Sequence, residues 1–145
     1  MSTTTYVDSN TTPSAIPNAL TTAAPVVGRA LISTLFILSG LSKIAAPAAT
    51  IGYIQSVGLP LPTIAFGLAA FVELIGGITL LLGYRTRIVA AVLFVFTLAT
   101  AVFFHHNFAD VNQFIHFFKN VAIAGGLLQV VAFGGGRLSL DGRAR

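Results

Sequence analysis

The sequence predicts an all-α membrane protein, an antiparallel bundle of four transmembrane helices with both termini in the cytoplasm. Hydrophobic residues make up 55% of the 145 residues and charged residues only 8%, whereas soluble domains carry about 25% charged residues. Four apolar runs each come close to the ~20 residues that a helix needs to cross ~30 Å of hydrocarbon. None of these runs shows the polar stripe of a helix in a soluble bundle.

The chain opens with residues 1–24, which are rich in Thr, Ser, Asn and Pro and carry Asp8 as their one charged residue. A signal peptide starts with a basic region that leads directly into an apolar core, and no Lys or Arg occurs here. We therefore expect a flexible polar tail that the mature protein retains.

A single membrane domain is expected over residues 25–134, followed by a short basic tail over 135–145. Its spans are predicted at about 25–46, 61–83, 88–104 and 114–133. The first connection carries no charge and is rich in the turn residues Gly and Pro. Because the connections are short, sequential antiparallel packing is the simplest topology.

Basic residues predict the orientation in the plasma membrane. Those outside the spans are Arg85 and Arg87 in the second connection and Arg137, Arg143 and Arg145 in the C-terminal tail. Both groups fall on one side of a four-span chain, and basic loops mark the cytoplasmic side. The histidine-rich connection then faces the periplasm or the cell exterior. This placement accounts for the net charge of +4, and the scattered bases argue against a nucleic-acid partner.

Four ionisable residues lie inside the predicted spans, where charge is costly and by default indicates function. They are Arg29 and Lys43 in the first span, Glu73 in the second and Lys119 in the fourth. At ~1.5 Å per residue, Glu73 lies near the middle of the bilayer, Arg29 nearer the cytoplasm and both lysines nearer the outside. Glu73 can pair with Arg29 or with a lysine, but it cannot neutralise three bases. The surplus predicts an anionic or carbonyl-bearing ligand in the outer half, or a lysine in a water-filled mouth. Snorkelling to the membrane surface is the alternative for Lys43, and a positive-inside anchor the alternative for Arg29.

Three helix faces are predicted to look into the bundle. The first-span face consists of residues at steps of three and four, namely Arg29, Ser33, Phe36, Gly40 and Lys43. Around Glu73, small residues such as Gly76 and Gly77 would let a neighbouring helix approach closely. In the fourth span, Gln113, His116 and Asn120 form a third stripe with Lys119 beside it.

All three histidines, His105, His106 and His116, lie near the outer ends of the third and fourth spans. With Asp110 they could hold a divalent metal, and His105 with His116 could ligate haem, but no signature such as H-x-x-x-H occurs. We therefore expect no metal and favour a hydrogen-bonded polar rim. The absence of Cys also excludes thiolate metal sites and iron–sulfur clusters. Six phenylalanines cluster here: Phe103, Phe104, Phe108, Phe114, Phe117 and Phe118. Phenylalanine in a membrane usually serves packing, but an aromatic-lined pocket edged by cations also suits a quinone ring.

Several short motifs follow one another in a definite order. They are Gly28-Arg29, Gly40-Leu41-Ser42-Lys43, 71–77, 82–87, His105-His106, 113–120, Gly125-Gly126 and 138–141. In this order and spacing the chain resembles the DoxX family of small four-helix membrane proteins, over about residues 27–142. The resemblance implies a redox-linked membrane role, because that family is similar to the small subunit of archaeal thiosulfate:quinone oxidoreductase. Its members are associated with quinone, sulfur and oxidative-stress metabolism. Since this chain has no Cys to hold a persulfide, self-contained sulfur transfer is not expected.

The expected function is a redox-associated role in which a quinone or a small oxoanion binds in the outer half of the bundle. Glu73 and Lys119 are the candidate catalytic residues, carrying a proton and polarising the ligand oxygen respectively. The candidate ligand-binding residues are Arg29, Lys43, His105, His106, Gln113, His116 and Asn120. Electrons would come from a partner redox subunit of a quinone-linked oxidoreductase, and a homo-oligomer is a second expected assembly. Two alternatives stay open: a non-catalytic subunit or scaffold of a redox or stress complex, and a small-anion transporter that oligomerises.

Overall fold

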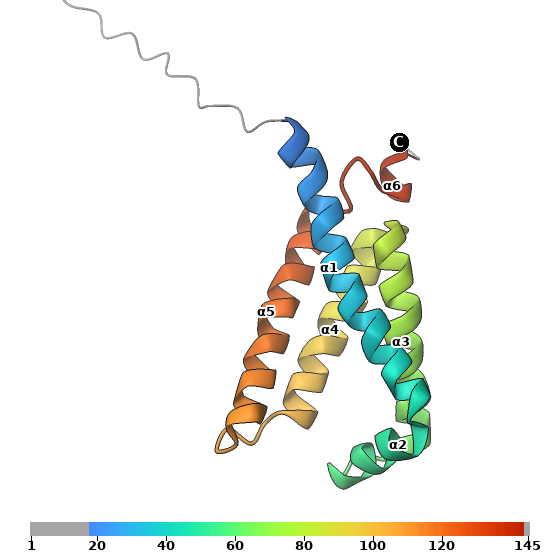
Figure 1. Ribbon diagram of the computed structural model, residues 1–145, viewed down its shortest axis with the longest axis vertical. Coiled ribbons are helices and arrows are strands. Elements are labelled where there is room, and N and C mark those ends of the chain that lie inside the picture. The colour runs from blue at the N-terminus through green and yellow to red at the C-terminus, as the bar shows by residue number, and fades with distance from the viewer. Residues whose placement is uncertain (1–17, 144–145) are drawn as a thin grey trace, which may run out of the picture.

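The computed structural model describes residues 18–143, and every regular element in this range is a helix. Four helices are long and apolar enough to cross a membrane: α1 (Asn18–Ala45), α3 (Pro62–Leu82), α4 (Thr86–Phe104) and α5 (Val111–Phe133). Two shorter helices are α2 (Pro47–Ser56) and α6 (Leu140–Arg143). The long helices run alternately in opposite directions, and the start of α1 lies at the same end of the bundle as α6 (Figure 1). The predicted all-α bundle of four membrane-spanning helices is confirmed.

Three helices begin earlier than the predicted spans, α4 by two residues and α1 and α5 by more. α1 begins at Asn18 and contains Pro25, so residues 18–24 of the predicted polar tail are helical; residues 1–17 lie outside the described part of the chain. α5 begins at Val111 because the Asp110 carboxylate caps it. That carboxylate accepts hydrogen bonds from the backbone N–H groups of Asn112 (2.8 Å) and Gln113 (3.4 Å).

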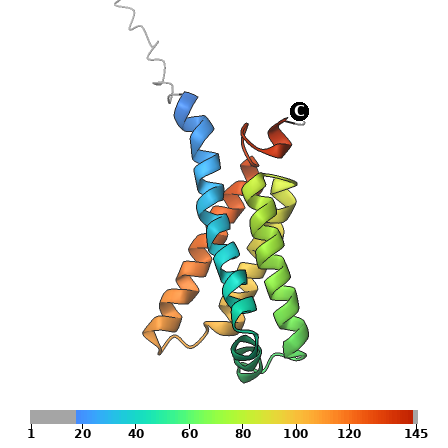
Figure 2. The ribbon, with the colours of Figure 1, turned by 45° about the vertical axis from the view of Figure 1, so that its right-hand side comes forward.

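The first connection contains a helix that the sequence did not predict. α2 starts at Pro47, which suits a helix start because the first N–H groups of a helix have no partner within it. The helix lies across one end of the bundle and not along it (Figure 2). Its one buried residue, Ile54, points toward the long helices and lines a cavity between them.

The bundle consists of two closely packed helix pairs, α1 with α3 and α4 with α5. Contacts between α3 and α4 join the pairs, whereas α1 and α5 meet much less extensively. In both ribbon views α1 and α5 diverge toward the end that carries α2 (Figures 1 and 2). All four long helices contribute to the buried core, which consists of Phe36, Leu80, Ala90, Leu93 and Leu127.

Glycines permit the close approach of α1 and α3. A Cβ atom at Gly40 would lie 2.7 Å from Leu74 Cγ, and one at Gly77 would lie 2.9 Å from Ile37 Cγ1. Backbones that come this close leave no room for side chains. The small-residue contact predicted beside Glu73 is therefore confirmed. The predicted inward face of α1 is confirmed as well, because its first four members, Arg29, Ser33, Phe36 and Gly40, are all buried.

The C-terminal segment folds back onto the end of the bundle where α1 begins. There the Asp141 carboxylate accepts hydrogen bonds from the backbone N–H of Arg85 (2.8 Å) and from both the N–H and the hydroxyl of Thr86 (2.7 Å each). It thus caps the N-terminus of α4 from a distant part of the chain. We call this region, formed by Arg29, Gly83, Thr86, Ser139 and Asp141, the capped end.

Candidate functional site

A cavity of about 750 Å³ occupies the opposite end of the bundle, between the four long helices and beneath α2. Six of the nine predicted site residues line it: Lys43, Glu73, His105, His116, Lys119 and Asn120. The other three, Arg29, His106 and Gln113, are not part of its lining. We call the six lining residues, together with Ser39, the open end. Four elements separated in sequence thus bring the predicted polar residues together.

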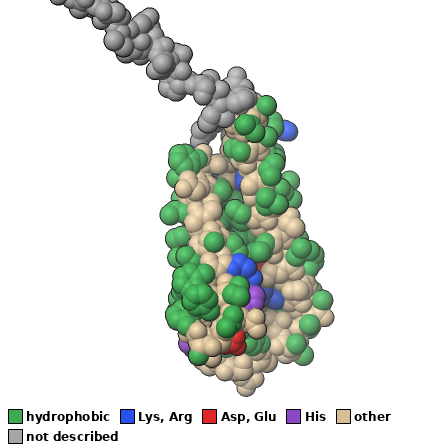
Figure 3. Space-filling model, turned by 60° about the vertical axis from the view of Figure 1, so that its left-hand side comes forward, with side chains coloured by type: hydrophobic (Ala, Val, Ile, Leu, Met, Phe, Trp, Pro, Cys, Tyr) green, Lys and Arg blue, Asp and Glu red, His purple; other side chains and the backbone are tan. Residues whose placement is uncertain are grey.

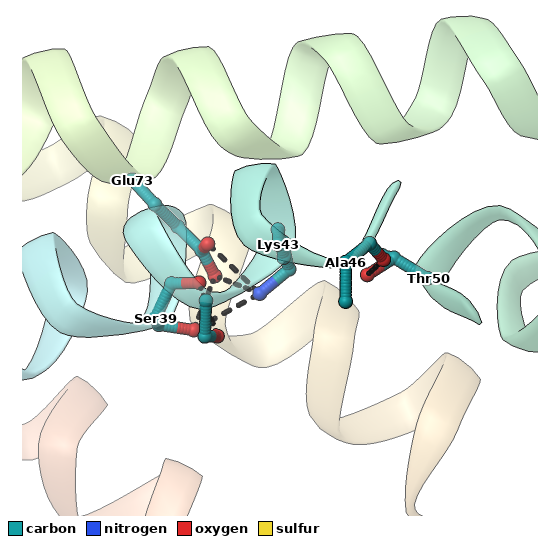
Figure 4. A network of polar contacts seen from close by, with 6 residues as sticks. Ser39, Lys43, Ala46, Thr50 and Glu73 are labelled. Atoms are coloured by element: carbon teal, nitrogen blue, oxygen red, sulfur yellow. Dashed lines mark hydrogen bonds and ion pairs between the residues drawn. The ribbon is translucent and has the colours of Figure 1, made fainter. Parts of the chain in front are cut away.

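The floor of this cavity is an ion pair between α1 and α3 (Figure 4). The Lys43 ammonium lies 2.8 Å from Glu73 Oε2 and donates a hydrogen bond to Oε1 at 2.9 Å. The Ser39 hydroxyl accepts a second bond from Lys43 (2.9 Å) and donates to Glu73 Oε1 (3.1 Å). Glu73 therefore pairs with a lysine and not with Arg29.

The ion pair is buried unequally. The Glu73 side chain is 7% exposed and that of Lys43 24%. Oε2 of Glu73 is fully buried and, although close to the ammonium, receives no hydrogen bond from the described residues. Its close contact is the Lys43 ammonium at 2.8 Å, so this oxygen is held by charge attraction at the buried side of the pair.

A second polar group lies on the α5 side of the cavity. Lys119 Nζ and His116 Nδ1 are 2.9 Å apart. Since an ammonium can only donate, the Nδ1 atom accepts, and neutral His116 carries its proton on Nε2. The ring of His105, at the end of α4, lies 5.1 Å from the His116 ring, measured between centroids, with 30° between their planes.

The environment of His105 favours its neutral form. Burial lowers the pKa of His105 below the usual 6.5, and the neighbouring His116 and Lys119 lower this pKa further. Both neighbours lie on α5, so the effect depends on the packing of α5 against α4. His105 and His116 both line the cavity, whereas His106 is not part of its lining; the hydrogen-bonded rim around the histidines stays a prediction.

Arg29 belongs to the capped end. Its Nη1 donates to the carbonyl oxygens of Leu80 and Leu81 at 3.3 Å each, and its Nη2 donates to that of Leu138 at 2.9 Å. The side chain is only 2% exposed. Arg29 thus holds the C-terminal end of α3 against the C-terminal segment and is not part of the cavity lining.

Sequence reasoning missed several lining residues. Ser39 precedes Lys43 by one helical turn, so the spacing of four residues could have identified it. Tyr53 lies on α2, which was not predicted; its hydroxyl donates to the Phe104 carbonyl at 3.3 Å, and the two rings are 5.5 Å apart. Thr97 also lines the cavity, but its hydroxyl is bonded to the Leu93 carbonyl (2.7 Å).

The predicted aromatic cluster is divided in two. Phe103 and Phe104 line the cavity together with Phe36 and Phe96. The other four phenylalanines contact one another at the start of α5 and are Phe108, Phe114, Phe117 and Phe118. Most of the aromatic lining therefore comes from α4, whereas the charged lining residues come from α1, α3 and α5. Among residues 18–143, no three His, Asp or Glu side chains are grouped so that they could hold a metal ion.

Comparison with known proteins gives consistent matches. The family model for DoxX matches residues 24–106. Over 116 residues the chain is 38% identical to the inner membrane protein YqjF of Escherichia coli, covering 80% of this chain and 88% of the relative. It is 35% identical over 123 residues to the Escherichia coli inner membrane protein YphA, covering 81% and 88%. A shorter match, 42% over 74 residues, covers 51% of the chain and 53% of the Bacillus subtilis protein named "Putative oxidoreductase CatD". No solved structure is significantly similar.

Proposed function

This chain belongs to the DoxX family and is a multi-pass membrane protein, and we propose that it binds a quinone, or a small oxoanion, in the cavity at the open end. The carrying observation is the Lys119–His116 pair, which faces the cavity with no carboxylate among the described residues to neutralise it. The oxidoreductase name of CatD supports a redox setting for this binding.

Charge complementarity supports a ligand with a partly or fully negative oxygen. The cavity is lined by one acid, Glu73, and by two lysines. Glu73 already neutralises Lys43 at 2.8 Å, so the positive charge of Lys119 is left over. An unpaired cation in a low-dielectric surrounding is stabilised by any nearby carbonyl or anionic oxygen.

The side chains could bind and orient such an oxygen without rearrangement of the ion pair. Lys119 has two ammonium protons beyond the one shared with His116, and the Nε2–H of His116 is a further donor. These donors would polarise a quinone carbonyl. The Glu73 carboxylate, which lines the cavity, would accept a hydrogen bond from the hydroxyl group of the reduced form. Electrons for reduction would come from a partner redox protein.

A structural role for the same charges is the second candidate. The Lys43–Glu73 ion pair joins α1 to α3 and is supported by Ser39. A buried pair of this kind can fix helix register without binding any ligand. In that case the chain would be a membrane subunit or scaffold, and the cavity would hold lipid or water.

For orientation, we propose that the capped end faces the cytoplasm and the open end faces the periplasm or the exterior. Arg85 and Arg87 lie at the capped end, next to the C-terminal segment that carries Arg137 and Arg143. This clustering agrees with the excess of basic residues on the cytoplasmic side of membrane proteins. The chain has no Cys, so single cysteines at Ser56 and Leu138 can be tested with a membrane-impermeant thiol reagent. In intact cells we expect labelling of Ser56→Cys and none of Leu138→Cys. Labelling of Leu138→Cys would contradict the proposed orientation.

The first test is mass spectrometry and absorption spectroscopy of protein purified in mild detergent. A quinone bound in stoichiometric amount is expected, and addition of an alkyl-tailed benzoquinone to stripped protein should restore it. Glu73→Gln and Lys119→Met should each weaken quinone binding by at least about tenfold, since each loses about one hydrogen bond to a charged group. Wild-type protein that binds no quinone would contradict the proposal.

A double variant separates the two candidate functions. Lys43→Met with Glu73→Leu removes both charges together, which costs a bundle much less stability than removal of one partner. If the cavity binds a ligand through Glu73, the double variant folds but binds quinone weakly. If the ion pair only fixes the register of α1 and α3, neither the wild type nor the double variant contains quinone, and Glu73→Gln destabilises the bundle more than the double variant does.

A further inference from the structure

We propose that the ligand enters the cavity sideways from the bilayer, through an opening between α1 and α5. The ligand is then an amphiphile with an oxygen-bearing headgroup and a long apolar tail, and not a water-soluble oxoanion. This inference rests on the proposed function, because it takes the cavity as the binding site, and it decides between the two ligand classes named there.

The opening follows from how α1 and α5 are packed. They touch toward the capped end, where a Cβ atom at Gly126 would lie 3.3 Å from Ile32 Cδ1. Toward α2 the two helices separate (Figures 1 and 2). The cavity lining from α1 includes Leu35 and Ser42, both of which are also exposed on the surface, Leu35 by 40%. Residues that line a cavity and are exposed at the same time mark its mouth.

The α5 edge of this mouth is polar. His116 and Lys119 line the cavity and are exposed. We call Leu35, Ser42, His116 and Lys119 the portal. Figure 3 shows this side of the molecule, where basic and histidine side chains gather in one place between hydrophobic side chains above and beside them. A polar opening within an apolar surface is therefore present at the depth of the membrane-spanning helices.

Elsewhere the cavity is bounded by α2 and by mostly apolar side chains, of which Leu68 on α3 and Phe103 on α4 are themselves exposed, by 61% and 50%. α2 lies across its outer end and contributes Thr50, Tyr53 and the buried Ile54. The Tyr53 hydroxyl bonds to the Phe104 carbonyl and so joins α2 to the end of α4. The packed pairs α1–α3 and α4–α5 form the side walls. A solute from the outer aqueous phase would have to displace α2, whereas a solute in the bilayer meets the portal directly.

The depth of Lys119 favours an amphiphile. It follows the start of α5 by eight residues, which places it about 12 Å along the helix from that end. A charged side chain that faces lipid at such depth is costly unless a polar group accompanies it. A headgroup oxygen held at Lys119 would supply that group, and the attached tail would lie in the hydrocarbon outside the portal. A free oxoanion would have to leave water entirely to reach the same place.

The test uses two leucines of α1. Leu35 lies at the portal, whereas Leu38 is 60% exposed on the same helix and does not line the cavity. Leu35→Trp narrows the portal, and Leu38→Trp adds the same bulk to the lipid-facing surface. Both positions are exposed, so both variants are expected to fold. Binding of a tritium-labelled, alkyl-tailed benzoquinone is followed over time by scintillation proximity on protein in phosphatidylcholine vesicles.

We expect Leu35→Trp to slow quinone association by about tenfold or more, and Leu38→Trp to leave it at the wild-type rate, because obstructed access lowers association rates. Equal rates for both variants would overturn the lateral portal. If sulfate or the tail-free benzoquinone bound as tightly as the tailed compound, the inference that the ligand is an amphiphile would be overturned. Wild-type protein that bound none of these probes would instead overturn the proposed function itself.

Discussion

The capped end and the open end each hold one basic residue of the same α1 face, but they satisfy its charge in different ways. Arg29 donates to three backbone carbonyls, two of them at the C-terminus of α3, where the helix dipole favours a cation. Lys43 instead pairs with the side chains of Glu73 and Ser39. Backbone partners are fixed by the fold, whereas side-chain partners can change rotamer or protonation. The comparison indicates that the capped end provides stability and that the open end is suited to ligand exchange.

Side-chain packing is also tighter at the capped end than at the open end. At the capped end, Gly135 is buried, and a Cβ atom there would lie 2.7 Å from Thr86 Oγ1. At the open end, α1 and α5 separate and a cavity of about 750 Å³ remains. The free energy of unfolding should therefore be much more sensitive to small changes at the capped end.

The largest effect is expected from Gly83→Ala at the capped end. Gly83 has φ 70°, and a Cβ atom there would overlap the Arg29 guanidinium and the Ser139 side chain. We expect the free energy of unfolding to fall by about 3 kcal/mol, from left-handed strain together with overpacking. Thermal unfolding in detergent, followed by circular dichroism, measures the change.

Gly67→Ala is the matched control for this substitution. Gly67 lies within α3, and a Cβ atom there would meet nothing within 4 Å. Since Ala is a better helix former than Gly, this variant should be as stable as the wild type or more stable by up to about 1 kcal/mol. If Gly83→Ala had the same melting temperature as Gly67→Ala, the capped end would not be closely packed.

A smaller effect is expected from Asp141→Ala, compared with Asp110→Ala. Both aspartates cap a helix, but Asp141 reaches α4 from another segment and accepts three hydrogen bonds. Asp110 caps its own helix, α5, in an exposed position. Asp141→Ala should cost about 2 kcal/mol and Asp110→Ala about 0.5 kcal/mol, the two limits of the usual range for caps. Equal losses in thermal unfolding would mean that the C-terminal segment does not stabilise the bundle.

The transmembrane part of the fold could be predicted from sequence because lipid imposes simple rules. Apolar runs of spanning length predicted the four helices, and steps of three and four predicted the buried face of α1. The same rules identified Glu73 and Lys43 as interior charges. Which basic residue pairs with Glu73 was left open, because that depends on how Gly40 and Gly77 bring α1 and α3 together.

The remaining features depend on contacts between distant segments. Arg29 bonds to Leu138, which lies 109 positions further along the chain, and no local pattern in the sequence indicates such a contact. The sequence of α2 shows little helical periodicity, because just one of its residues, Ile54, is buried. His106 was grouped with the site because it is adjacent to His105, but neighbouring side chains point in different directions. Gln113 was grouped because it shares a helix stripe with His116 and Asn120, yet it is not part of the cavity lining.

The smallest expected effect is a pH dependence that comes from the open end alone. Two of the three histidines, His105 and His116, lie there, and burial, followed by the neighbouring His116 and Lys119, lowers the pKa of His105. As pH falls through about 6.5, the unfolded chain takes up a proton at this residue before the folded chain does. Stability contributed by neutral His105 is therefore present above the unfolded pKa and is lost as pH falls toward the lower folded pKa. The melting temperature should decrease as pH falls from about 7.5 to about 5.5, and His105→Gln should reduce that decrease.

Lys119→Met should also reduce this decrease, though less, because it removes just one cause of the lowered pKa of His105. Since Asp141→Ala alters the other end, it should lower the melting temperature at both pH values by the same amount. A His105→Gln protein with an unchanged pH dependence would show that His105 is not held in its neutral form by the packing of α4 against α5.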